Sequence, residues 1–454
     1  MRPLKIGISW VRGVVGETLT PALLVDFACA FGTFAEGAAI AVGHDSRRSA
    51  PMVRAAVLAG LQSCGCPVVD LGLAPTPVVQ YTVCSRGLAG GISVSASHND
   101  SRWNALKFIG RDGILLNSYQ SEEVMDIYHL GVFRRCSWNS LGEVRPLPGA
   151  AARYFDFLLG KLDVDSIRRA GFKVVTDACA GAGAGLVSSF LERLGCTVIA
   201  LNDEATGEFP HSPEPNVRNM QGLASVVKGV GADLGFLVNS DADRVGLVAR
   251  GGVILSEEYV FPIVADYLLR SARGCLVSTL STSRMVESVA ERHGRAVVRA
   301  RIGEGHVVQK VVLEKAALGG EGSGGVIVPR WARWFDGFIT IGTVLESMAR
   351  NRASLLELSG RLPGYIMLKG SVFSSSERIY PVIESFRNRF REENPNLEDG
   401  VRVDWEDSWL HVRASNTEPL IRVIVEAEDA GRAREVFDRC MEQIRRIQAG
   451  RSEG

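Results

Sequence analysis

The chain has 454 residues, which is too long for a single hydrophobic core, and two to four domains are expected. Its 51 Lys and Arg residues balance its 51 Asp and Glu residues, so the formal net charge is zero. This balance argues against a general nucleic-acid or membrane-surface binder, because such proteins carry an excess of basic residues. It leaves room for a local basic pocket that binds a phosphate.

The nine cysteines include no C-x-x-C pair, and most of them lie in apolar runs. We therefore expect buried, reduced thiols rather than disulfides or a zinc site. The N-terminus leads directly into a strand-like run without a signal peptide, and no uncharged apolar stretch is long enough to cross a bilayer. These observations predict a cytoplasmic protein.

Strand-like and helix-like segments alternate through the first part of the chain. Thr20 is placed to cap a helix whose first residue is Pro21, and apolar residues recur at helical spacing between 53 and 61. The segments expected to form strands are 6–16 (interrupted by a glycine turn), 40–43, 68–72 and 88–92, with helices after Thr20, over about 50–63 and from 75–77 onward.

The same order of strand, helix and strand returns twice. Strands are expected at 172–176, 197–200, 234–238, 274–278 and 296–299, with helices around 186–194, 284–293 and 307–313. Three related α/β domains with mixed sheets and right-handed crossovers are the economical interpretation. The alternative is that βαβ alternation is common and that no true repeat exists. We place these domains at residues 1–148, 149–251 and 252–361.

The last part of the chain has a different pattern. Residues 401–405 and 409–413 alternate apolar and polar about a polar turn, as the two strands of a hairpin do. Further strands are expected at 366–372 and 420–428, and helices at 379–392 and 430–447. Residues 362–454 are therefore expected to form a smaller C-terminal α+β domain.

Each expected domain carries one polar loop beside a strand. In the first, Ser93-Val94-Ser95-Ala96-Ser97-His98-Asn99-Asp100 places hydroxyls, an imidazole and an amide where ligands bind in open α/β sheets. A polar turn without function is the alternative, since a lone serine such as Ser97 needs a group that activates it. In the second, Asn239, Asp241 and Asp243 place side-chain oxygens at alternate positions, which can converge on a hard cation such as Mg²⁺. An acidic surface turn is the alternative there.

Two further loops have the composition of a sugar-phosphate site. Gly320-Glu321-Gly322-Ser323-Gly324-Gly325 offers Glu321 and Ser323 to sugar hydroxyls, and a glycine-rich hinge is the alternative. Arg413-Ala414-Ser415-Asn416-Thr417-Glu418-Pro419 combines a forked guanidinium, two hydroxyls and backbone N–H groups that can form a nest for a phosphate. Arg422 follows three residues later.

The four loops resemble, in the same order and over nearly the whole chain, the active-site loops of the α-D-phosphohexomutase superfamily. This superfamily comprises phosphomannomutases, phosphoglucomutases and phosphoglucosamine mutases. Its patterns are T-A-S-H-N-P for the serine loop, D-x-D-x-D-R for the metal loop, G-E-x-S-G-H for the sugar-recognition loop and R-x-S-[GN]-T-E-P for the phosphate loop. Val11-Arg12-Gly13 and Lys107 resemble two further segments of the family.

The resemblance implies a role for each matched residue. Ser97 would carry a phosphoryl group with His98 beside it, and Arg12 and Lys107 would assist proton transfer from the attacking sugar hydroxyl. The implied ligands of Mg²⁺ are Ser97, Asn239, Asp241 and Asp243. The residues implied in substrate binding are Arg244, Glu321, Ser323, Arg413, Ser415, Asn416, Thr417 and Arg422.

The activity that the resemblance implies is that of an isomerase acting by intramolecular phosphotransfer. It would interconvert the 1-phosphates and 6-phosphates of glucose or mannose through a phosphoserine and a 1,6-bisphosphate, with glucose 1,6-bisphosphate as activator. A phosphoglucosamine mutase is the alternative within the family. We expect hexose phosphates as ligands, no nucleic-acid or membrane partner, and a monomer or homodimer.

Several positions depart from the family pattern. Asn239 replaces the usual first aspartate and removes a negative charge, so weaker Mg²⁺ binding than in relatives is expected. Trp10, Asp100 and Phe335 also differ from the usual residues, and Gly325 replaces a histidine of several members. These departures motivate a second hypothesis, a sugar-phosphate-binding paralogue with little catalysis. A metal-dependent phosphatase shares the acidic loop but does not explain the serine and phosphate loops together.

Overall fold

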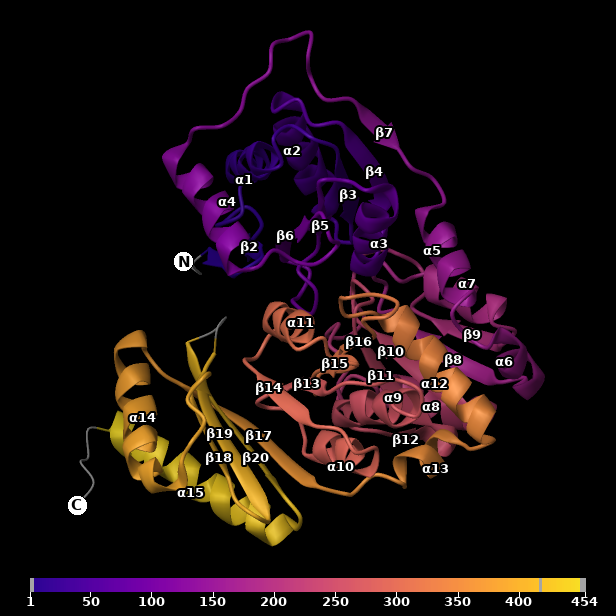
Figure 1. Ribbon diagram of the computed structural model, residues 1–454, viewed down its shortest axis with the longest axis vertical. Helices are drawn as coiled ribbons and strands as arrows, with labels where there is room; N and C mark the ends of the chain where they lie inside the picture. The colour runs from indigo at the N-terminus through magenta and orange to yellow at the C-terminus, as the bar shows by residue number, and fades with distance from the viewer. Residues whose placement is uncertain (1–3, 416–418, 450–454) are drawn as a thin grey trace.

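The computed structural model describes residues 4–415 and 419–449, and its four sheets follow one another along the chain (Figure 1). The first sheet has seven strands in the order β1-β2-β6-β5-β3-β4-β7. β3, β4, β5 and β7 are parallel, whereas β6, β2 and β1 are added as antiparallel neighbours, so the sheet is mixed. Its strands are β1 (Lys5–Ile6), β2 (Trp10–Val14), β3 (Ile40–His44), β4 (Val68–Leu73), β5 (Gly90–Val94), β6 (Trp103–Gly110) and β7 (Val144–Pro146).

The helices of the first unit cover both faces of this sheet. They are α1 (Pro21–Phe34), α2 (Ala50–Ser63), α3 (Thr76–Arg86) and α4 (Ser118–Leu130). As the sequence predicts, Thr20 caps α1 by accepting the N–H of Leu23, and Pro21 begins the helix. Apolar residues of α1, α2 and α4 pack together on one face, and those of α3 belong to a different hydrophobic cluster on the other face.

The second and third sheets are also mixed. The second has the order β12-β11-β10-β8-β9 and the third has the order β14-β13-β15-β16. In each, three neighbouring strands are parallel, and the remaining strands are added as antiparallel neighbours. The strands are β8 (Lys173–Asp177), β9 (Thr197–Leu201), β10 (Leu234–Val238), β11 (Val245–Ala249), β12 (Val253–Ile254), β13 (Leu276–Thr279), β14 (Val297–Ala300), β15 (Leu318–Gly320) and β16 (Val326–Ile327).

One hydrophobic cluster extends through the first three units. It includes Val79 of α3, Tyr154, Phe190, Phe261 and Phe338, all of them buried. The helices of the second and third units are α5 (Ala150–Leu159), α6 (Val164–Ala170), α7 (Leu186–Arg193), α8 (Gln221–Val230), α9 (Val260–Leu268), α10 (Met285–Arg292), α11 (Glu304–Leu313), α12 (Gly337–Asn351) and α13 (Leu355–Ser359). Of these and the earlier helices, α4, α5, α6, α9, α12 and α13 are not predicted from the sequence.

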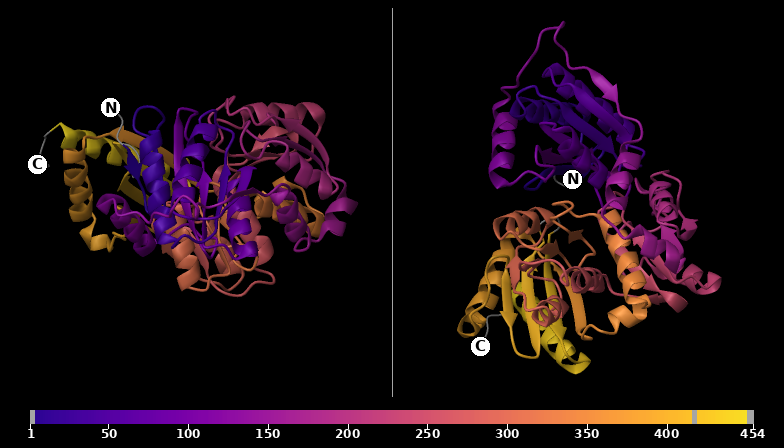
Figure 2. Two further views of the ribbon diagram at one scale, coloured as in Figure 1. Left: turned by 90° about the horizontal axis from the view of Figure 1, so that it is seen from above. Right: turned by 45° about the vertical axis from the view of Figure 1, so that its right-hand side comes forward.

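The C-terminal unit is an antiparallel sheet with two helices and a hydrophobic cluster of its own. The sheet order is β17-β20-β19-β18, with β17 (Ile366–Phe373), β18 (Val401–Asp404), β19 (Ser408–Ala414) and β20 (Leu420–Ala427). α14 (Ser376–Arg389) and α15 (Ala430–Gln448) contribute Phe386 and Ile444 to the cluster. Figures 1 and 2 show this unit, drawn in orange and yellow, at the periphery of the molecule.

Polar contacts join the C-terminal unit to the third unit. Ser281 Oγ and His411 Nδ1 are 2.8 Å apart, and the N–H of Ile302 donates to Asp399 Oδ2 at 2.9 Å. The expected class, three α/β units with mixed sheets followed by a smaller α+β unit, is confirmed. Within residues 4–415 and 419–449, no helix combines the length and the apolar character that a membrane span requires.

Candidate active site

Ser97 lies in the loop between β5 and β6, and its backbone is held by three hydrogen bonds. Its N–H donates to Ser95 Oγ at 3.1 Å, and its carbonyl oxygen accepts from Arg47 Nη2 at 2.9 Å and from Ser240 Oγ at 2.7 Å. The φ of Ser97 is +50°, a left-handed conformation that is uncommon for residues with a side chain and concentrates at functional sites. Its Oγ is buried and accepts from Asn239 Nδ2 at 3.2 Å.

A buried ion pair supports this loop from the end of β3. Asp45 pairs with Arg47, and Asp45 Oδ2 accepts from Ser95 Oγ at 2.7 Å. Arg47 also donates to the carbonyl oxygen of Asn99 at 2.6 Å. No role was predicted for these residues from the sequence. The signal that could have found them is an acidic and a basic residue two positions apart directly after a buried strand.

The loop between β10 and β11 brings Asn239, Asp241 and Asp243 to Ser97, and all of them are buried. Asn239 Oδ1 accepts the backbone N–H groups of Asp243 at 3.0 Å and of Arg244 at 3.1 Å. Asn239 Nδ2 donates to Asp243 Oδ1 at 2.7 Å and to Asp241 Oδ1 at 2.9 Å. The amide of Asn239 therefore connects the backbone of its own turn to both carboxylates and to the serine hydroxyl.

Lys107 of β6 occupies the other side of the two carboxylates. Its Nζ lies 2.5 Å from Asp241 Oδ2 and 3.1 Å from Asp243 Oδ2, and Thr76 Oγ1 donates to Asp241 Oδ2 at 3.2 Å. Burial alone would lower the pKa of Lys107, but Asp241 and Asp243 outweigh it and raise this pKa. Burial would likewise raise the pKa of Asp241, but Lys107 outweighs it and lowers this pKa to about 2. The ammonium of Lys107 and the carboxylate of Asp241 are therefore both charged at neutral pH.

Arg12 and His98 complete the surroundings of the serine. Arg12 of β2 is buried, donates to Asn99 Oδ1, and stacks on the ring of Trp10 with 4.7 Å between the guanidinium carbon and the ring centre. Burial lowers the pKa of Arg12 to about 10. Burial and the charges of Arg12 and Arg244 lower the pKa of His98 well below its usual value, so its imidazole is neutral at neutral pH.

The sugar-recognition loop predicted at 320–325 lies against the acidic loop. Arg244 Nη2 forms an ion pair with Glu321 Oε1 at 2.9 Å, and Ser323 donates to the same carboxylate. Gly325 pairs with Arg244 in an isolated β-bridge. A Cβ added to Gly325 would lie 2.7 Å from Phe335 Cδ2. The glycine at 325 and the phenylalanine at 335, which both depart from the family pattern, are therefore linked, because a side chain at position 325 would collide with the phenylalanine ring.

The predicted phosphate loop lies in the C-terminal unit. Arg413 of β19 is directly opposite Arg422 of β20, so both side chains project from the same face of the sheet. Arg413 is buried and pairs with Asp399 at 3.3 Å, while its Nη2 has no hydrogen-bond partner among the described residues. Ser415 follows the end of β19. The predicted positions Asn416 and Thr417 lie outside the described residues.

Comparison with known proteins shows which family has this arrangement of units and loops. Four models of the phosphoglucomutase/phosphomannomutase family match the chain in order: alpha/beta/alpha domain I at residues 4–134, domain II at 152–252, domain III at 256–365 and the C-terminal domain at 379–443. The chain is also 32% identical over 441 residues to a phosphoglucomutase/phosphomannomutase from Thermococcus kodakarensis, covering 95% of this chain and 96% of the relative. The chain belongs to the phosphoglucomutase/phosphomannomutase family.

Two further comparisons place this family member among its relatives. It is 34% identical to a protein named probable phosphoglucosamine mutase from Methanopyrus kandleri, over 97% of this chain and 99% of the relative. The solved structure of a phosphoglucomutase/phosphomannomutase family protein from Burkholderia thailandensis matches it with a TM-score of 0.86 at 26% identity, over 96% of this chain and 97% of the other. The family consists of phosphomutases, which are isomerases, and the resemblance found in the sequence is confirmed.

Besides Asp45, Arg47 and Thr76, the site of this family member contains Glu304, which was not predicted from the sequence. Glu304 begins α11, and burial together with the charge of Asp243 raises its pKa to about 8. The backbone N–H of Phe335 donates to Glu304 Oε1 at 3.3 Å. The available signal was an acidic residue directly after Gly303, three residues before the helix predicted around 307–313.

The family implies a metal, and the donor set of this chain fits a divalent cation poorly. Asp241 Oδ1, Asp243 Oδ1 and Ser97 Oγ converge on one point, but the atom at that point is Asn239 Nδ2, an N–H donor. Mg²⁺ binds oxygen acceptors. The oxygen of Asn239, which the sequence analysis expects as a ligand, accepts two backbone N–H groups instead. Across the described ranges, no group of three or more His, Cys, Asp or Glu residues could hold a metal ion.

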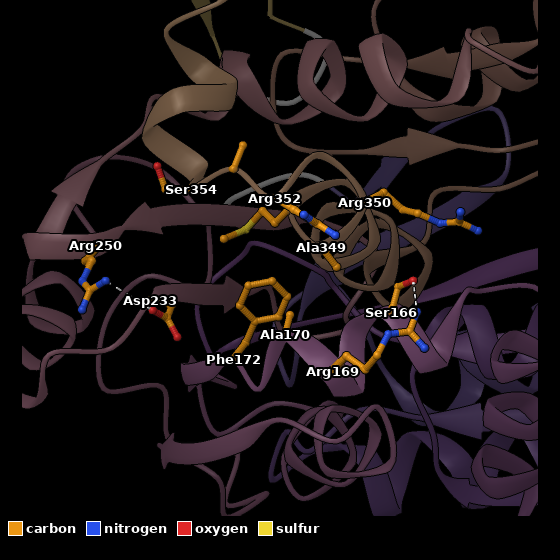
Figure 3. Close-up of a pocket in the computed structure, with 12 residues that line it drawn as sticks. Ser166, Arg169, Ala170, Phe172, Asp233, Arg250, Ala349, Arg350, Arg352 and Ser354 are labelled. Atoms are coloured by element: carbon orange, nitrogen blue, oxygen red, sulfur yellow. Dashed lines mark hydrogen bonds and ion pairs between the residues drawn. The ribbon is translucent and has the colours of Figure 1, made fainter.

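Two other cavities of this family member contain none of the predicted site residues. One, of about 670 Å³, lies between α6 and the C-terminal end of α12 and is lined by Arg169, Phe172 and Arg352 among others (Figure 3). The second, of about 960 Å³, is lined by Asp177 and His211 among others. The first cavity is lined by arginines and two serines, but neither cavity contains a residue of the Ser97 group.

Proposed function

We propose that this protein is a phosphohexomutase that converts hexose 1-phosphates to hexose 6-phosphates and back, with Ser97 as the phosphoryl carrier. The observation that carries the proposal is the buried group in which Ser97 Oγ, Asp241, Asp243 and Lys107 lie together, with Arg12 nearby. The family assignment supports it. The unit boundaries proposed from the sequence, 1–148, 149–251, 252–361 and 362–454, give one predicted loop to each unit.

In the first half of the reaction, the bond between Ser97 Oγ and phosphorus breaks and a bond from the sugar O6 to phosphorus forms. His98 is the proposed acceptor for the proton of the 6-hydroxyl, because its imidazole is neutral at neutral pH. Its buried Nδ1 has no hydrogen-bond partner among the described residues, so no other group of the described chain occupies it. The proton then passes to Ser97 Oγ, and hexose 1,6-bisphosphate is formed.

In the second half, the bisphosphate turns over in the site and the reaction runs in reverse at the other end. The bond from O1 to phosphorus breaks, the phosphoryl group returns to Ser97, and hexose 6-phosphate leaves. Glucose 1,6-bisphosphate would activate the enzyme because it can phosphorylate Ser97 by the same step. The C-terminal unit would hold the phosphate at the end of the sugar that is not reacting.

Fixed positive charge is the main catalytic contribution that we assign to the chain. The transition state of phosphoryl transfer spreads negative charge over the phosphoryl oxygens, and preorganised cations stabilise it. Arg12, Lys107 and Arg244 supply this charge. Lys107 remains protonated because Asp241 and Asp243 raise its pKa, so it acts as a hydrogen-bond donor rather than as a base.

Arg413 and Arg422 are the proposed clamp for the distal phosphate. Arg413 and Arg422 lie directly opposite each other on neighbouring strands, so a phosphate between them would be attracted by both guanidinium groups. A guanidinium also matches the geometry of a phosphate with two parallel hydrogen bonds. Ser415, Asn416 and Thr417 would complete this loop around the phosphate.

Glucose and mannose phosphates are the proposed substrates, and glucosamine phosphate is the alternative. A Thermococcus kodakarensis relative is named for the first pair, and a Methanopyrus kandleri relative is named for the second sugar. Glu321 and Ser323, which already share a hydrogen bond, would bind the sugar hydroxyls. Mg²⁺ is the cation to test with this chain, because the family implies it whereas Asn239 Nδ2 occupies the point on which Asp241 and Asp243 converge.

A phosphorus NMR time course tests the function. The purified protein is mixed with a trace of glucose 1,6-bisphosphate and, in turn, with glucose, mannose and glucosamine 1-phosphate, with Mg²⁺ or with EDTA. A 6-phosphate signal with one sugar supports the proposal and names the substrate, and Ser97→Ala should abolish it whereas Ser101→Ala, on the exposed part of the same loop, should not. If no 6-phosphate signal appears with any of the three sugars, although a thermal-shift control shows that the sugar phosphate binds, a non-catalytic sugar-phosphate-binding protein would be favoured instead.

A further inference from the structure

The side chain of Asn239 has only one favourable orientation, because its two ends meet different partners. Its Oδ1 accepts the backbone N–H groups of Asp243 and Arg244 at 3.0 and 3.1 Å. If the amide were turned over, its NH₂ group would face these two N–H donors, and both would lose their acceptor. Buried donors without an acceptor are costly, so the amide nitrogen is directed to the opposite side.

On that side, the nitrogen of Asn239 lies where three oxygens converge. Nδ2 is 2.7 Å from Asp243 Oδ1, 2.9 Å from Asp241 Oδ1 and 3.2 Å from Ser97 Oγ. These are the acceptors that a hard cation would bind. Asn239 is fully buried, so its amide cannot turn out to solvent within this packing.

The remaining carboxylate oxygens also have donors. Lys107 Nζ lies 2.5 Å from Asp241 Oδ2 and 3.1 Å from Asp243 Oδ2, and Thr76 adds a hydrogen bond to Asp241 Oδ2. All four carboxylate oxygens of the acidic loop are therefore paired with N–H or O–H donors of the chain itself. A divalent cation would have to displace the amide of Asn239 and compete with the ammonium of Lys107.

We propose that in this chain the Asn239 amide and the Lys107 ammonium take the place of a divalent cation between Ser97 and the two aspartates. The site then binds its phosphorylated sugar, and acts on it, without a divalent cation. The part that concerns turnover rests on the proposed function, whereas the part that concerns cation binding does not. Aspartate at position 239 would present a second oxygen in place of the nitrogen and would complete a set of three carboxylates.

Direct titration with Mn²⁺, followed by the electron paramagnetic resonance signal of the free ion, tests the cation part. We expect no specific binding to the wild type and at least about tenfold tighter binding to Asn239→Asp, with Mg²⁺ competing. Asn351→Asp, which adds the same charge at a site far from Ser97 in the sequence, is the matched control and should behave as the wild type. Stoichiometric Mn²⁺ binding by the wild type that Asp243→Asn removes would overturn the proposal.

Calorimetric titration with glucose 1,6-bisphosphate tests the ligand part on the unmodified chain, so the result does not depend on whether Asn239→Asp folds. We expect the same affinity in EDTA and in Mg²⁺, and the same turnover wherever turnover is found. Affinity or turnover that is lost in EDTA and restored by Mg²⁺ would overturn the proposal. Absence of turnover with every sugar would refute the proposed function alone, because the Mn²⁺ titration still decides whether the amide excludes the cation.

Discussion

Replacing Lys107 by methionine tests how the buried charges around Ser97 are balanced. Lys107 lies 2.5 Å from Asp241 and 3.1 Å from Asp243, and all three side chains are buried. Removing one partner of a buried ion pair costs about 3–5 kcal/mol, because the remaining charge is left uncompensated. We expect Lys107→Met to lose this amount of unfolding free energy. The first three units share one hydrophobic cluster and are expected to unfold together, and over about 360 residues the loss corresponds to a melting temperature that is roughly 4–7 °C lower.

Differential scanning calorimetry at neutral pH measures this effect and its cause. Lys107→Arg is the control that keeps the charge and should melt well above Lys107→Met. Adding Asp243→Asn to Lys107→Met removes one of the two uncompensated carboxylates, so the double variant should melt above Lys107→Met. A Lys107→Met protein that melts within about 2 °C of the wild type would refute the reasoning, since the carboxylates would then not depend on Lys107 for their charge.

Ser97→Ala should lower kcat by at least roughly a thousandfold while calorimetry still detects binding of glucose 1,6-bisphosphate, and near-normal turnover would exclude Ser97 as the carrier. Arg413→Ala should raise KM for the hexose phosphate about 10–100-fold with a smaller change in kcat; an unchanged KM in steady-state kinetics would remove Arg413 from the phosphate clamp. Burial alone would lower the pKa of His211, but its hydrogen bond to Asp177 raises it from the ordinary value of 6.5 to about 10. A raised pKa in the folded state stabilises the fold fully below pH 6.5, and this contribution is lost as the pH rises to about 10. The stability difference between the wild type and His211→Gln in urea denaturation should therefore shrink from pH 6 to pH 10, and a difference that grows over this range would contradict the assignment.

The fold class was readable from the sequence because buried parallel strands are short, apolar and regularly followed by helices. β10, which is buried at every position, and the hairpin of β18 and β19 lie where their patterns place them. The unassigned helices were missed for a different reason. α5 and α12 carry clear apolar faces, but the strands before them, β7 and β16, have only three and two residues and are too short to give a strand pattern.

The sequence predicted which loops form the site, but it did not predict the contacts between individual atoms of these loops. Ser97, Asp241 and Asp243 come from two units whose approach depends on packing across the whole chain. The role of Arg47 arises only when its guanidinium reaches the carbonyl oxygen of Ser97, fifty positions further along the chain. The orientation of the Asn239 amide depends on two backbone N–H groups in its own turn, and composition does not report such a contact.

The separation of the hydrophobic clusters determines how this molecule can move. The first three units share one cluster, so they cannot part without exposing apolar side chains to water. The C-terminal unit has its own cluster, which includes Phe386 and Ile444, and is tied to the third unit by contacts such as those of Ser281 with His411 and of Ile302 with Asp399. Where water can replace such a hydrogen bond, the bond contributes only about 0.5–1.5 kcal/mol of net stability. Rotation of the C-terminal unit would therefore leave both clusters intact, and a substrate as long as a sugar bisphosphate could enter and turn without unfolding any part of the protein.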